Sequence, residues 1–136
     1  MLKKLFSILS SCIITFFCFL GLKMPVFNKY ADNFIMYTLD SNNKFVSTKV
    51  DIFTYLISSD VIGEGIILPK EKQTEFIKDF NAQLILVENI NQGTNYYYYS
   101  PKIRKSVRVQ NKTVNLHIFI SENTMMAGSP IIFGSY

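Results

Sequence analysis

The chain has 136 residues, of which 49% are hydrophobic and 15% aromatic. This length excludes two ordinary domains, and the abundance of apolar side chains excludes an intrinsically disordered protein, because a core can be buried. The formal net charge of +4 includes Lys3, Lys4 and Lys23; without these three, 11 of the 14 basic residues remain against 10 acidic ones. The overall charge therefore predicts no nucleic-acid partner.

An apolar stretch, residues 5–22, follows two lysines at the start of the sequence. A positive start and a long apolar run are typical of an export signal, and as a helix the run measures about 27 Å, close to the thickness of a bilayer. We expect residues 1–24 to be a signal peptide or a retained transmembrane helix, which places residues 25–136 outside the cell membrane or in the medium. The poor cleavage pattern after the stretch favours retention. The alternatives are lipidation at Cys12, which ends a Leu-Ser-Ser-Cys box, and a buried core helix.

The first part of the predicted domain combines helix, turn and strand signals. Apolar side chains at helical spacing predict a short amphipathic helix over residues 27–38. The polar run 40–44 predicts a turn, and the β-branched and aromatic residues of 46–57 predict a strand. Asp60 and Glu64 lie in a glycine-containing stretch without the spacing of a calcium-binding loop, so we interpret them as part of a solvated loop rather than as an acid/base or calcium site.

The second part of the domain predicts one helix followed by antiparallel strands. Pro69 and the apolar stripe that follows it indicate a helix over residues 69–83. Strands are expected over residues 84–87, 96–99, 106–109, 113–121 and 131–133, with a loop at 89–95 and turns at 110–112 and 122–126. This order predicts an α+β fold in which one main helix packs on one face of a curved antiparallel sheet.

Two segments near the C-terminus resemble a known family. VNLHIFIS, residues 114–121, and AGSPIIFGSY, residues 127–136, are similar to the ending of the YwmB family of Gram-positive bacteria, and a weaker match extends back to about residue 50. The residues of these segments that we single out are Asn115, Gly128, Ser129, Pro130, Ile131, Ile132 and Tyr136. Ser129 and Ser135 depart from the threonine and glutamate that are usual in the family.

The resemblance implies one half of a saddle similar in shape to TATA-box-binding proteins. Family members are nearly twice as long and contain two repeats, whereas this chain has room for one. The family also implies an exported or membrane-anchored protein to which no activity is firmly attached. A single repeat leaves an open sheet edge, from which we expect a homodimer.

Five basic residues cluster within eleven positions, next to a run of tyrosines. The cluster and its aromatic neighbours are Lys102, Arg104, Lys105, Arg108 and Lys112, with Tyr97 and Tyr99. Cationic and aromatic side chains together suit nucleic acid, but an exported domain meets no chromosomal DNA. Attraction to anionic envelope polymers or lipid head groups is the preferred functional interpretation, and a plain solvated hairpin is the alternative.

The sequence contains none of the common catalytic or cofactor motifs. Both cysteines, Cys12 and Cys18, lie in the apolar stretch, so the domain has neither a disulfide nor a thiol nucleophile. His117 is the only histidine and is interpreted as a surface or half-buried strand residue. We therefore expect a non-catalytic binding or structural module of the cell envelope, without cofactor or metal. The alternatives are a nucleic-acid-binding saddle-type domain and an enzyme with an unrecognised carboxylate site.

Overall fold

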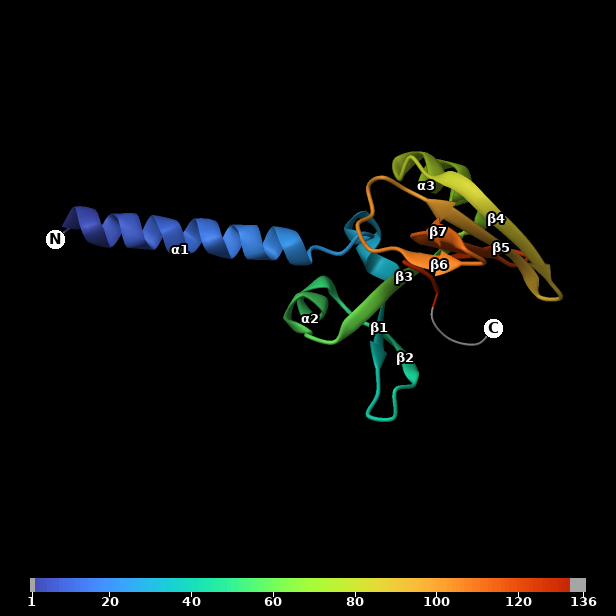
Figure 1. Ribbon diagram of the computed structural model, residues 1–136, viewed down its shortest axis with the longest axis horizontal. Coiled ribbons are helices and arrows are strands. Elements are labelled where there is room, and N and C mark those ends of the chain that lie inside the picture. The colour runs from blue at the N-terminus through green and yellow to red at the C-terminus, as the bar shows by residue number, and fades with distance from the viewer. Residues whose placement is uncertain (1, 133–136) are drawn as a thin grey trace.

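The computed structural model describes residues 2–132, apart from the side chains of residues 2, 19–23 and 31–33. A long N-terminal helix, α1 (Leu2–Lys23), extends away from a twisted sheet (Figure 1). The shorter helices are η1 (Asn28–Asn33), α2 (Ile52–Ile57), η2 (Lys70–Lys72) and α3 (Gln73–Asp79), where η marks a 3-10 turn. The strands are β1 (Phe34–Leu39), β2 (Phe45–Lys49), β3 (Val61–Pro69), β4 (Gln83–Ile90), β5 (Gly93–Tyr99), β6 (Val107–Val109), β7 (Lys112–Val114), β8 (Leu116–Ile120) and β9 (Thr124–Ser129).

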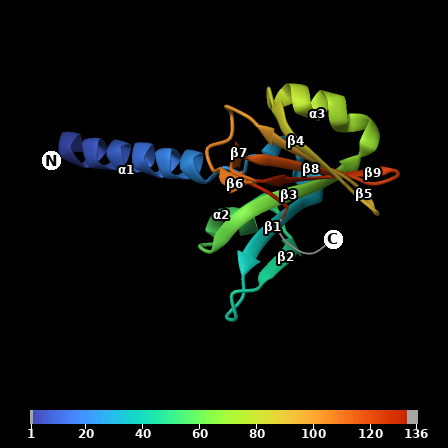
Figure 2. The same ribbon diagram turned by 45° about the vertical axis from the view of Figure 1, so that its right-hand side comes forward.

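Seven strands form one antiparallel sheet in the order β2-β1-β3-β9-β8-β5-β4, and β6 pairs with β7 in a separate hairpin. The strands β3, β4, β5, β8 and β9, with α3 after the first of them, form a unit of strand, helix and antiparallel meander. The helix and the meander were predicted, but the strand β3 was not. The hairpin β1–β2 extends this unit past β3, as Figure 2 shows from a second side. The predicted α+β class with an antiparallel sheet is confirmed.

The core lies on the sheet face that η1 and α3 cover. Ile66, Ala127 and Ile118 stand in register on the neighbouring strands β3, β9 and β8, and all three are buried. Aromatic rings from the covering segments fill the space above them; the ring centroids of Phe76 and Phe80 are 4.8 Å apart. Phe27, just after α1, packs against both rings and is fully buried. Burial of this apolar face supplies the main driving force for folding.

The predicted helix over residues 27–38 is wrong in its second half. The chain forms a 3-10 turn up to Asn33 and then the strand β1, which pairs with both β2 and β3. Phe34 and Met36 alternate onto the core face of the sheet, opposite Ile66 and Glu64 of β3. Strand pairing therefore overrides the helical spacing of the apolar residues, because hydrogen bonds to β2 and β3 satisfy the backbone N–H and C=O groups of this segment on both edges.

The predicted turn at residues 40–44 is confirmed, but the predicted strand 46–57 is only half correct. Asp40 organises the β1–β2 turn by accepting backbone hydrogen bonds from residues 42 and 44. Strand β2 ends at Lys49, and Asp51 then caps α2 by accepting a hydrogen bond from the Thr54 N–H at 2.7 Å. An aspartate at this position starts a helix because its side chain satisfies a free backbone N–H group.

The interpretation of residues 60–65 as a solvated loop is wrong. Residues 61–69 form β3, an interior strand between β1 and β9. Glycine suits this strand, because a Cβ added at Gly65 lies only 2.8 Å from Tyr37 Oη. Glu64 faces the core side of the sheet with Ile66 and is buried.

The predicted elements of the second half are largely confirmed, with shifted ends. The helix is shorter than residues 69–83, because Asn81 has a left-handed backbone with φ of 48° after α3 ends at Asp79. The predicted strand 113–121 is interrupted at Asn115 into β7 and β8. The predicted turn 122–126 closes after two residues, since β9 begins at Thr124. Ile131 and Ile132 are not part of a strand, and Phe133 lies outside the described residues.

Helix α1 coincides with the apolar stretch of the sequence. The described side chains of residues 3–18 are all exposed, so the alternative of a buried core helix is wrong. Both cysteines are exposed on it and unpaired. Over the described part of the chain, no helix combines the length and apolar character that a membrane crossing requires.

Candidate functional site

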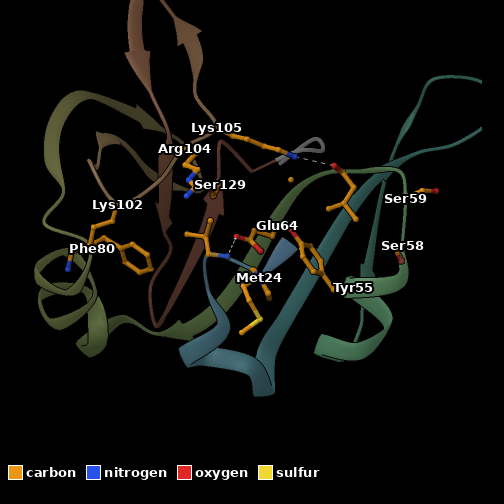
Figure 3. Close-up of a pocket in the computed structure, with 14 residues that line it drawn as sticks. Met24, Tyr55, Ser58, Ser59, Glu64, Phe80, Lys102, Arg104, Lys105 and Ser129 are labelled. Atoms are coloured by element: carbon orange, nitrogen blue, oxygen red, sulfur yellow. Dashed lines mark hydrogen bonds between the residues drawn. The ribbon is translucent and has the colours of Figure 1, made fainter. Parts of the chain in front are cut away.

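A pocket of about 620 Å³ opens where α1 joins the domain (Figure 3). It is lined by four separate parts of the chain: the α1–η1 connection at residues 24–26, α2 and the residues after it, β3, and the loop between β5 and β6. Ser129 of β9 and Phe80 complete the lining. Its volume is in the range of small-molecule sites.

Glu64 provides the one carboxyl group among the described residues that line the pocket, and it is 2% exposed. Its Oε1 accepts a hydrogen bond from the Val26 N–H, just after α1. Its Oε2 is buried without a hydrogen-bond partner among the described residues. Burial raises the pKa of Glu64 to about 8, against the opposing effects of the Val26 backbone hydrogen bond, the Lys105 charge and the Phe27 backbone N–H. At neutral pH the carboxyl group of Glu64 is therefore protonated in most molecules.

Tyr55 of α2 is half-buried beside Glu64, and Figure 3 shows its ring pointing toward the carboxyl group. Burial, and to a lesser extent the charge of Glu64, raises the pKa of Tyr55 well above its usual range. Tyr55 therefore stays neutral and presents an aromatic ring and a hydroxyl group to the pocket.

Three of the predicted basic residues meet at this pocket. Lys102, Arg104 and Lys105 are exposed and line it from the β5–β6 loop. Lys105 Nζ donates to the Val61 carbonyl of β3 at 3.4 Å, and so extends across the mouth (Figure 3). Lys102 Nζ donates to the Asp79 carbonyl at the end of α3, where a cation is favoured. In the described part of the chain, these three side chains form no ion pair within 4.0 Å.

Asn115 holds the loop that carries these cations. It is fully buried at the break between β7 and β8. Its Oδ1 accepts from the Ser100 N–H at 2.7 Å, and its Nδ2 donates to the carbonyls of Ser100 and Ile103 at 2.7 and 2.9 Å. Ile103 is buried as well and anchors the middle of the loop. The asparagine singled out in the sequence therefore positions the basic side chains of the pocket.

The rest of the predicted basic and aromatic patch does not reach the pocket. Arg108 and Lys112 belong to the hairpin β6–β7, where they donate to the carbonyls of Asn111 and Ile85. Tyr97 is 9% exposed, and its ring stacks on that of His117. Tyr99 is exposed at the end of β5. These four residues are therefore not part of the lining of this pocket, and the predicted anionic-ligand patch over all seven residues stays a prediction.

His117 is a buried residue, so its interpretation as a surface or half-buried strand residue is wrong. Its exposed fraction is 1%, its Nε2 lies 3.0 Å from Asn95 Oδ1, and its Nδ1 accepts from the Ile132 N–H at 3.3 Å. These contacts require the neutral ring with the proton on Nε2. Burial accordingly lowers the pKa of His117 to about 4. Its role in the described structure is to attach the chain after β9 to the sheet.

The C-terminal motif makes the chain turn back over the sheet. Gly128 is needed there, since a Cβ added to it lies 2.6 Å from Ile132 N. The Ser129–Pro130 peptide bond is cis, and Ile132 is buried after it. Tyr136, the last of the motif residues, lies outside the described residues. The packing therefore explains the residues from Gly128 to Ile132 without assigning them a ligand.

Glu64 is the site residue that the sequence interpretation missed. The sequence did contain a signal. Side chains alternate between the two faces of a strand, so a strand through these residues places Glu64 on the same apolar face as Ile66 and Leu68. The two flanking glycines concealed the strand. A strand through residues 61–69 with an acid on its apolar face is the pattern that identifies such a site.

In the described part of the chain, no three His, Cys, Asp or Glu side chains lie close enough together to bind a metal ion. Comparison with family models, with curated proteins and with solved structures finds no match for this chain. The resemblance to the YwmB family therefore stays a prediction, carried mainly by the two C-terminal segments.

Proposed function

We propose that this protein is an exported or membrane-anchored, non-catalytic module of the cell envelope that binds a phosphate-bearing group, from a lipid or an envelope polymer, in the pocket beside α1. The observation that carries the proposal is the group of three cations, Lys102, Arg104 and Lys105, held on a braced loop at the pocket mouth. Cations that are already positioned bind an anion with less loss of side-chain freedom.

The envelope location is supported by the apolar stretch behind two lysines, residues 5–22, and by the exposure of the described side chains of α1. Such a helix in water leaves a large apolar surface uncovered, which a bilayer or an export receptor covers. The half-saddle architecture belongs to the same proposal and is supported by the order β3, α3, β4, β5, β8, β9 of the main unit.

The location predicts which part of the chain reagents outside the cell can reach. We expect Asn42→Cys, in the exposed β1–β2 turn, to react with a membrane-impermeant maleimide on intact cells when Cys12 and Cys18 are both changed to serine. The matched control is the double serine variant without the new thiol. Labelling that requires permeabilised cells contradicts the location.

The binding proposal predicts a dependence on the pocket cations that is larger than a general charge effect. We expect the full-length protein in detergent micelles to bind glycerophosphoglycerol, measured by calorimetry, and Arg104→Gln with Lys105→Gln to weaken this binding about tenfold or more. Arg108→Gln with Lys112→Gln removes the same charge on the β6–β7 hairpin and should change binding little. Equal losses in both double variants, or no binding at millimolar concentration, contradict the proposal.

The enzyme alternative has one specific observation in its favour, which is the raised pKa of Glu64 in a pocket. Acid–base catalysis by a carboxylate pair needs a second carboxyl group, and Glu64 is alone among the described lining residues. The binding module therefore remains the better-supported proposal. The nucleic-acid alternative needs an extended basic surface, whereas Arg108 and Lys112 lie apart from the pocket.

A further inference from the structure

The pocket contains a carboxyl oxygen that no described group of the protein satisfies. Glu64 Oε2 is buried and lacks a hydrogen-bond partner among the described residues, while Oε1 is held by the Val26 N–H. Buried polar atoms without a partner are uncommon in native structures, and each one needs an explanation, such as a functional role or a bound water or ion. The unsatisfied oxygen therefore bears on the chemistry of what the pocket takes.

Two of the three cations of the pocket donate hydrogen bonds to backbone carbonyls and not to Glu64. Lys102 donates to the carbonyl at the end of α3, and Lys105 donates to the Val61 carbonyl. The α1–η1 connection contributes only the uncharged residues 24–26, and the remaining polar lining residues, Tyr55, Ser58, Ser59 and Ser129, carry hydroxyl groups and no charge. A positively charged donor from a ligand can therefore pair with Oε2, and the ring of Tyr55, which lies beside Glu64 in Figure 3, is placed to support a cation.

We infer that the ligand carries both a phosphodiester and a primary amine, with the phosphate at Arg104 and Lys105 and the ammonium group paired with Glu64 Oε2. This inference rests on the proposed function and adds the second charged group to it. A pocket of about 620 Å³ accommodates two such groups joined by a short spacer. The head group of an aminated phospholipid and an amine-bearing envelope polymer share this chemistry.

Binding of an ammonium group requires the ionised form of Glu64, so the carboxyl proton is released to solvent when the ligand binds. The free protein holds this proton up to about pH 8 because the group is buried. Affinity for an amine-bearing ligand must then rise with pH toward that value, by up to about tenfold per pH unit. The other charged or titratable groups around Glu64 are Tyr55, which stays neutral, and the cations Lys102, Arg104 and Lys105.

The test compares two soluble diesters that differ in the amine, sn-glycero-3-phosphoethanolamine and sn-glycero-3-phosphoglycerol. Both phosphates keep one negative charge and the amine keeps its positive charge from pH 5 to 8, so pH dependence in this range reports on the protein. We expect the full-length protein in detergent micelles to prefer the amine about tenfold or more at pH 8, with the preference shrinking toward pH 6. In Glu64→Gln the preference should disappear at every pH, while phosphoglycerol binding is kept.

The outcomes separate this inference from the proposed function. Equal affinity of the wild-type protein for the two diesters overturns the amine inference and leaves anion binding standing. Absence of binding by both diesters overturns both. A preference that persists unchanged in Glu64→Gln overturns the role of Glu64, and a wild-type comparison alone decides the ligand class if this variant does not fold.

The same assay distinguishes the two sources of the ligand. Phosphatidylethanolamine added to the micelles should compete with the soluble amine diester if the pocket takes a lipid head group, and phosphatidylglycerol should compete less. Competition by the first lipid supports the lipid form of the inference. Undiminished affinity for the soluble diester in its presence overturns that form and supports the polymeric one.

Discussion

Glu64 shows how one buried side chain couples stability to pH. The folded protein keeps the Glu64 proton up to about pH 8, whereas the unfolded chain releases it near the ordinary value of 4.5. Between these values the folded state binds more protons, so stability falls as pH rises. His117 acts in the opposite sense, because its folded-state pKa of about 4 lies below the ordinary 6.5, and its contribution is lost as pH falls through this window. Between pH 4.5 and 6.5 the two groups change the stability in opposite directions. Above pH 6.5 only Glu64 contributes, and stability falls with rising pH.

We therefore predict that Glu64→Gln becomes increasingly more stable than the wild type as pH rises from 5 to 8. The difference in unfolding free energy should grow by up to about 1.4 kcal/mol per pH unit, because the amide has no proton to lose. Denaturant unfolding at a series of pH values measures it. The exposed Glu122→Gln is the matched control and should leave the profile unchanged. A constant difference between the two proteins across this range contradicts the prediction.

At the scale of the element, the β5–β6 loop is the part of the site that depends most on a remote residue. Asn115 lies outside the loop and yet satisfies backbone groups at Ser100 and Ile103. Ser100 itself donates through Oγ to the Phe80 carbonyl, which joins the loop to the end of α3. The cations therefore occupy their places because two buried polar residues secure the start of the loop.

We predict that Asn115→Ala lowers the unfolding free energy by about 3 kcal/mol, because three buried backbone groups lose their partner. At a temperature where the variant is still folded, binding of glycerophosphoglycerol should also weaken, since the cations are no longer held. Asn123→Ala, an exposed change of the same type, is the control for both measurements. An Asn115→Ala protein with full stability contradicts the bracing role.

At the scale of the whole molecule, the sheet is open at both ends. The hairpin β1–β2 covers the edge of β3, so the outer strands are β2 and β4. All five residues of β2 are exposed, and Val87 of β4 is 43% exposed. Outer strands carry backbone groups that can pair with a second chain.

The expected homodimer therefore leads to a prediction about these edges. We expect sedimentation velocity to show concentration-dependent dimers of the full-length protein in detergent micelles, and a lysine on the pairing strand to weaken them. Val46→Lys tests β2 and Val87→Lys tests β4, each as the control for the other. A single monomeric species throughout the concentration series contradicts the expectation.

Much of the architecture was predictable because its signals are local. The polar run after Leu39, the helix after Pro69 and the meander of short strands each depend on residues close together in the chain, and all three are present. The errors arose where a distant partner decides the conformation. Residues 34–39 become a strand because β2 and β3 pair with them, and residues 61–65 do so because β1 and β9 flank them.

The amino-acid sequence by itself determined the α+β class, the apolar N-terminal helix and the cluster of basic residues after Ser100, since these follow from composition and short-range pattern. Only the tertiary structure decided which of those basic residues share a pocket and that Glu64 lies in it. The physical reason is that the pocket joins segments more than a hundred residues apart, from Met24 to Ser129, and burial depends on all of them at once. The pKa of a buried acid depends on the side chains and backbone that surround it in space, and the residues next to it in the chain do not determine it.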